Sequence, residues 1–131
     1  MLIFLRKHWK SITWALVLLL LSTIPDSQFP ESKLFSLPHF DKFVHLFLYF
    51  VFTILLISGN NAHRLRRRVT VSAIVCAAFI SLPFGIAMEV VQLQLVPSRS
   101  AEVYDLAANV AGFLLALIAY RPANRITDGF I

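Results

Sequence analysis

The stretch Phe43–Ser58, FVHLFLYFVFTILLIS, decides the fold class, because it is long, apolar and free of Asp, Glu, Lys and Arg. Similar runs occupy Ile12–Ile24, Val69–Leu95 and Val103–Tyr120. A helix needs about 20 mostly apolar residues to cross the hydrocarbon core of a bilayer. The pattern predicts an all-α membrane protein, a bundle of four transmembrane helices. The predicted spans are approximately residues 10–25, 41–59, 69–95 and 102–120.

The composition of the whole chain supports a membrane protein. The 131 residues are 58% hydrophobic and 15% charged, against about 25% charged in typical soluble domains. The mean hydropathy is +0.74. A small soluble domain buries too little of its surface to hide this apolar content, and a disordered chain needs low hydrophobicity. These features exclude a disordered chain, argue against a soluble enzyme domain and predict a single membrane domain over residues 1–131.

The distribution of basic residues predicts the orientation. The net charge is +5, with the basic residues in clusters between apolar runs, which is typical of membrane loops and not of nucleic-acid binding. Nine lie on one side of the predicted spans: Arg6, Lys7, Lys10, Arg64, Arg66, Arg67, Arg68, Arg121 and Arg125. Three lie on the other side: Lys33, Lys42 and Arg99. The positive-inside rule therefore predicts a multi-pass protein with both termini in the cytoplasm.

Two of the predicted spans need comment. The first can also be read as a signal peptide, but Ser22–Pro25 lacks a clear small-x-small cleavage site, which favours retention as a span. In the third span, Pro83 removes a backbone hydrogen bond, and the sequence therefore predicts a kink there.

Polar residues concentrate at the predicted outer ends of the last three spans. Asp41, His45 and Tyr49 follow one helix face at a spacing of four residues, and Asp105 and Asn109 do the same. Charges inside a membrane normally face the bundle interior and pair, so these stripes predict one connected polar cluster. The predicted site comprises Asp41, Lys42, His45, Tyr49, Glu89, Gln92, Arg99, Asp105 and Asn109.

Four short motifs at these positions resemble those of the VanZ-like family of membrane proteins. Asp41–Tyr49 resembles its D-K-x-x-H-x-x-x-Y signature, and Glu89–Gln92 resembles its E-x-x-Q element. Pro97–Arg99 resembles P-x-R, and Asp105–Gly112 resembles D-x-x-x-N-x-x-G. The order and spacing agree over roughly residues 41–120. The resemblance implies a protein of the bacterial cell membrane and these site residues, but it implies no particular reaction. The family is named for a protein associated with resistance to the lipoglycopeptide teicoplanin.

Three functions remain open at this point. The site can bind a lipid headgroup, a lipid-linked envelope intermediate or a lipophilic glycopeptide, with Lys42, His45 and Arg99 engaging an anionic group. It can instead belong to an intramembrane hydrolase or transferase acting on a lipid ester or phosphoester, with His45, Glu89 and Asp105 as candidate catalytic residues. Third, the cluster can be purely structural, because interhelical hydrogen bonds also hold membrane helices together.

The expected partners are membrane lipids or the lipid-linked intermediate, without nucleic acid, and a homo-oligomer is compatible with the small size. No cofactor is predicted. A metal ion held by His45, Glu89 and Asp105 is chemically possible, but it requires a convergence of three helices that sequence cannot test, so no metal is predicted.

Overall fold

The computed structural model describes residues 2–24, 39–61, 69–95 and 103–126. Every regular element in these ranges is a helix: α1 (Leu2–Thr23), α2 (Phe40–Asn61), α3 (Val71–Leu95) and α4 (Val103–Ile126). The prediction of an all-α protein is therefore confirmed for the described residues. α4 continues through Pro122, beyond the predicted end of the last apolar run.

Three of the four described helices are long and apolar enough to cross a membrane: α2 over Phe40–Asn60, α3 over its full length, and α4 over Val103–Tyr120. Large apolar side chains such as Phe79 and Ile118 are more than 70% exposed, as expected where the surrounding solvent is lipid. α1 is not among these three, since Arg6, Lys7 and Lys10 lie in its first half.

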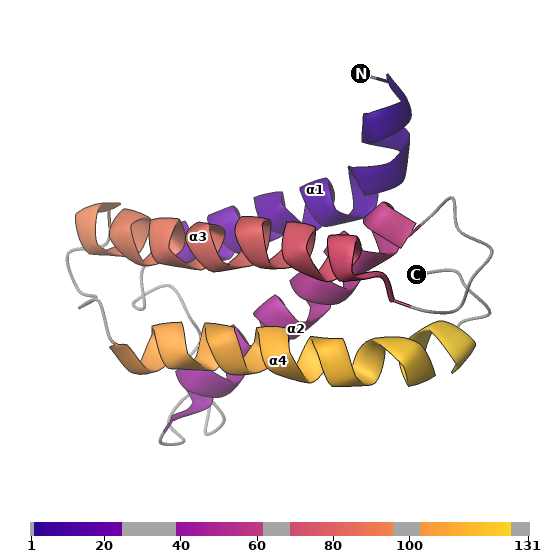
Figure 1. The fold of residues 1–131 in the computed structure, drawn as a ribbon. Coiled ribbons are helices and arrows are strands. Elements are labelled where there is room, and N and C mark those ends of the chain that lie inside the picture. Colours follow the sequence, from indigo (N-terminus) through magenta and orange to yellow (C-terminus); the bar gives the residue numbers. More distant parts are fainter. Residues whose placement is uncertain (1, 25–38, 62–68, 96–102, 127–131) are drawn as a thin grey trace.

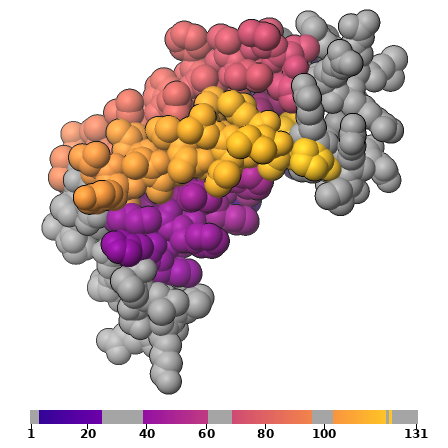
Figure 2. Space-filling model, turned by 60° about the horizontal axis from the view of Figure 1, so that its bottom comes forward, coloured from indigo at the N-terminus to yellow at the C-terminus, as the bar shows by residue number. Residues whose placement is uncertain are grey.

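α2 is the central helix of the bundle. It contacts all three other helices, and its pairing with α4 is the most extensive. Figure 1 shows α3 and α4 side by side and antiparallel, with α2 crossing behind them and α1 behind α3. Seen from below, α4 lies along both α2 and α3 (Figure 2). The beginnings of α2 and α4 thereby meet the end of α3.

The close pairing of α2 and α4 depends on Gly112. A Cβ atom at this position would overlap the carbonyl oxygen of Leu46 and lie 2.9 Å from the amide nitrogen of Phe50. Both atoms belong to the backbone of α2, which cannot rotate away as a side chain can. Glycine therefore allows the two backbones to approach more closely than any other residue would.

α3 faces its neighbours through small side chains. Its buried residues include Ala73, Ala77, Ser81 and Gly85, each four positions after the last, and the same spacing leads to Glu89. The helix begins after Thr70, whose Oγ1 accepts a hydrogen bond from the amide of Ala73 at 3.3 Å, as a capping residue does. Pro83 lies inside the helix, which continues on both sides of it, and the kink stays a prediction.

α1 and α3 are each joined to α2 by a polar contact. The indole Nε1 of Trp14 donates to the carbonyl oxygen of Leu48 at 3.0 Å, which joins α1 to α2. The hydroxyls of Thr53 and Ser81, both 0% exposed, lie 3.3 Å apart and join α2 to α3. Hydrogen bonds of this kind satisfy polar groups that have no access to water.

Candidate functional site

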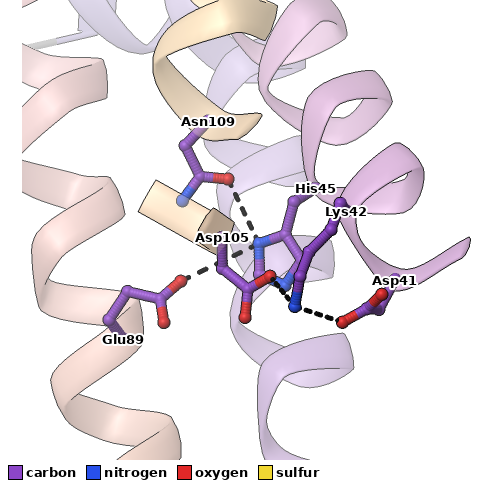
Figure 3. Close-up of polar contacts among 6 residues, drawn as sticks. All are labelled: Asp41, Lys42, His45, Glu89, Asp105 and Asn109. Carbon is purple, nitrogen blue, oxygen red and sulfur yellow. Dashed lines mark hydrogen bonds and ion pairs between the residues drawn. The ribbon is translucent and has the colours of Figure 1, made fainter. Parts of the chain in front are cut away.

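Polar side chains from α2, α3 and α4 meet where α2 and α4 begin and α3 ends (Figure 3). Asp41 and Asp105 lie in the first turns of α2 and α4, where the positive end of the helix dipole favours a carboxylate. Glu89 lies in the last part of α3. The antiparallel arrangement brings residues that are up to 64 positions apart in sequence within hydrogen-bonding distance.

Lys42 joins two carboxylates. Its Nζ atom donates a hydrogen bond to Asp41 Oδ2 at 2.6 Å and forms an ion pair with Asp105 Oδ1 at 2.8 Å. Asp105 is buried, whereas the Asp41 side chain is 55% exposed. Lys42 therefore already balances negative charge within the protein, and its engagement of an external anion stays a prediction.

His45 lies between α3 and α4. Its Nδ1 atom is 3.1 Å from Asn109 Oδ1 and 3.8 Å from Glu89 Oε1. An amide oxygen only accepts hydrogen bonds, so Nδ1 carries the proton that it donates to Asn109. In a neutral imidazole the other ring nitrogen, Nε2, then holds the lone pair. Asn109 thus fixes both the orientation of the ring and its tautomer.

Two buried polar atoms in and beside this group can still form a hydrogen bond with a further molecule. The Tyr49 hydroxyl and Asn109 Nδ2 are buried, and no described residue forms a hydrogen bond with either of them. Gly85 lies beside both: a Cβ atom there would come within 3.3 Å of Tyr49 Cε1 and 3.5 Å of Asn109 Nδ2. Unsatisfied polar groups are costly away from water, so these atoms are candidates for contact with a ligand.

The structure brings together most of the predicted site residues. Figure 3 shows six of them in one group: Asp41, Lys42, His45, Glu89, Asp105 and Asn109. Tyr49 lies one helical turn further along α2, and Gln92 is buried on α3 three residues after Glu89. Arg99 lies outside the described residues. Gly85, which lies beside Tyr49 and Asn109, was not among the residues predicted for the site.

The charge of this six-residue group limits what it can bind. Three carboxylates and one ammonium carry two negative charges in excess when all four groups are ionised and His45 is neutral. The group therefore attracts cations or hydrogen-bond donors, and a bare anion would be repelled by Glu89 and Asp105. Among the described residues that could hold a metal ion are His45, Glu89 and Asp105.

Comparison of the chain with protein-family models, with curated proteins and with solved structures finds no match.

Proposed function

We propose that this chain is a VanZ-like protein of the bacterial cell membrane and that its polar cluster binds the polar headgroup of a membrane lipid. Such a lipid can be a lipid-linked intermediate of the cell envelope. The observation that carries the proposal is the meeting of six polar side chains from three apolar helices at one end of the bundle. Within this proposal, binding of a lipophilic glycopeptide such as teicoplanin at the same site would connect the protein to resistance.

A purely structural role explains this arrangement less well. Interhelical hydrogen bonds contribute only about 0.6 kcal/mol each on average, whereas placing a charge at the centre of the membrane is unfavourable by about 2.5–3.5 kcal/mol. A cluster that served only to hold helices together would be expected to satisfy its own members. The Tyr49 hydroxyl and Asn109 Nδ2 instead find no hydrogen-bond partner among the described residues, and a headgroup with acceptor oxygens would supply one.

Removing the Tyr49 hydroxyl tests this function without disturbing the fold. We expect Tyr49→Phe to lose at least half of the specific lipid that co-purifies with the wild-type protein, because a hydrogen bond to the headgroup is lost. The ring itself, which is 3% exposed, stays in place. The measurement is mass spectrometry of lipids retained in native-lipid particles, normalised to protein. Arg99→Ala is included because Arg99 is part of the predicted site.

Tyr104→Phe is the matched control, since Tyr104 is 75% exposed on α4 and lies outside the cluster. It should retain the wild-type lipid profile. A wild-type profile identical to that of the bulk membrane would contradict headgroup binding. Equal enrichment in wild type, Tyr49→Phe and Arg99→Ala would show that lipid binds elsewhere.

The same proposal includes four membrane spans, with α1 as the first, both termini in the cytoplasm and a bend at Pro83. The polar cluster then faces the outer leaflet. Single cysteines in a Cys76→Ala background test this topology in spheroplasts with an impermeant thiol reagent. A cysteine at Ser32 should react within minutes, whereas cysteines at Phe4 and Ala62 should react only after permeabilisation.

Phe4 is the deciding position for α1. Reaction of both Phe4→Cys and Ser32→Cys from outside would mean that α1 does not cross the membrane. Reaction of Ala62→Cys but not Ser32→Cys would reverse the orientation and place the polar cluster at the cytoplasmic leaflet.

A further inference from the structure

The three residues His45, Glu89 and Asp105 each contribute one potential metal ligand atom, and these atoms lie within 4.8 Å of one another. They come from three different helices, α2, α3 and α4. Glu89 and Asp105 are each 8% exposed. We propose that they form a binding site for one divalent transition-metal ion of the zinc type, with the remaining coordination position open to a ligand.

The types of ligand fit this class of ion. Zinc binds imidazole nitrogen and carboxylate oxygen at about 2.0–2.2 Å, and catalytic or ligand-exchanging sites use three protein ligands and leave a position open. Tetrahedral ligands at that distance lie about 3.4 Å apart. The three atoms therefore need to approach one another by at most about 1.4 Å, a shift that rotation of the two carboxylate side chains can supply.

The surroundings of His45 prepare it to bind a metal. A metal-bound histidine usually donates its second ring N–H to an oxygen, which fixes the tautomer and the ring direction. Asn109 Oδ1 is such an oxygen, 3.1 Å from Nδ1. With Nδ1 protonated, Nε2 is the ring nitrogen whose lone pair can bind a metal. Asn109 is 2% exposed, so its amide holds a fixed position.

The charge of the cluster and the buried Tyr49 hydroxyl both favour binding of a metal ion. The cluster has two negative charges in excess when His45 is neutral, and a divalent ion would balance them. Lys42 pairs with Oδ1 of Asp105, and a carboxylate has a second oxygen that can coordinate a metal. Tyr49 is 3% exposed, and its hydroxyl has no hydrogen-bond partner among the described residues. It can therefore bond a metal-bound water or headgroup oxygen.

The ion would also explain how an acidic cluster can receive a phosphate. Glu89 and Asp105 repel an anion, but a metal ion between them presents an open, positively polarised position. This role rests on the proposed function, whereas binding of the ion itself does not. The proposed order is thus metal first and the anionic oxygen of the headgroup second.

Isothermal titration calorimetry tests the site. ZnCl2 is titrated into the chelator-treated protein in detergent. We expect one ion per chain with a micromolar or tighter Kd. His45→Gln and Glu89→Gln should each weaken binding at least tenfold. His39→Gln is the matched control, since His39 is exposed and lies outside the cluster, and it should bind zinc as the wild type does.

Two results would overturn the inference. One is the absence of zinc binding to folded wild-type protein, with folding checked by circular dichroism. The other is binding that persists at wild-type affinity in His45→Gln and Glu89→Gln, which would indicate an adventitious ion only. If either glutamine variant does not fold, Asp105→Asn replaces it, and the wild-type titration decides by itself whether any ion binds.

Lipid analysis in the presence of EDTA separates this inference from the proposed function. Lipid enrichment that survives EDTA in a protein that binds no zinc would leave headgroup binding intact and remove the metal. Zinc binding without lipid enrichment would leave the metal site intact and contradict headgroup binding.

Discussion

Replacement of Lys42 by methionine is expected to lower the free energy of unfolding by about 2–4 kcal/mol. Lys42 Nζ contacts Asp105 Oδ1 at 2.8 Å, and the two side chains are 18% and 11% exposed. Methionine preserves most of the length of the side chain but removes the ammonium, which leaves a buried carboxylate without its counter-charge. The measurement is equilibrium unfolding in mixed detergent micelles, followed by circular dichroism.

Asp41 provides an internal control for this effect. It contacts the same ammonium at 2.6 Å, but its side chain is 55% exposed, so water can replace the lost contact. Asp41→Asn should therefore change stability by less than about 1 kcal/mol. The double variant Lys42→Met/Asp105→Asn should regain part of the loss, because the uncompensated charge has gone. Equal losses in Lys42→Met and Asp41→Asn would contradict a special role for the buried ion pair.

Substitution of Gly112 by alanine is expected to destabilise the bundle by about 1–3 kcal/mol, although alanine favours helices more than glycine does. The added methyl group would overlap the carbonyl oxygen of Leu46 and approach the amide of Phe50. Relief of this overlap requires the whole of α4 to move away from α2. Thermal unfolding in detergent should show the loss as a lower midpoint temperature.

Gly85→Ala is the matched comparison, since it makes the same chemical change inside another helix. A methyl group there meets only side-chain atoms, the nearest being Tyr49 Cε1 at 3.3 Å, and these can shift. Its effect on stability should stay below about 1 kcal/mol. If the two variants are equally stable, the close approach of α2 and α4 is not what Gly112 provides.

The grouping of the polar residues could be predicted from sequence because it follows from simple geometry. Residues four apart share a helix face, so His45 had to lie near Asp41, and Asn109 near Asp105. Alternating directions of apolar helices then bring the ends carrying these pairs to one side. Both steps hold in the structure, where His45 and Asn109 lie 3.1 Å apart.

Other features depended on packing that the sequence does not specify. The role of Lys42 follows from the distance between α2 and α4, which Gly112 sets. The buried face of α3 could not be predicted from the sequence either. A repeat of four residues advances about 40° beyond a full turn at each step, so the face rotates by about 160° between Ala73 and Glu89. No single side of α3 is consistently polar or apolar as a result. Three helices of the described residues are long and apolar enough to cross a membrane, and the fourth span stays a prediction.

Small side chains line the buried face of α3, so a larger residue at one of these positions would shift the helix relative to its neighbours. Ala77 is 0% exposed, so a larger side chain there has no space and must push α3 away from the bundle. Ala77 and Glu89 are separated by about 18 Å along the helix axis, and the unbroken helix, with Pro83 between them, joins the two positions. The position of one carboxylate of the cluster is thereby coupled mechanically to the opposite part of the helix. Substitutions far from the polar cluster can consequently change the position of its Glu89 carboxylate.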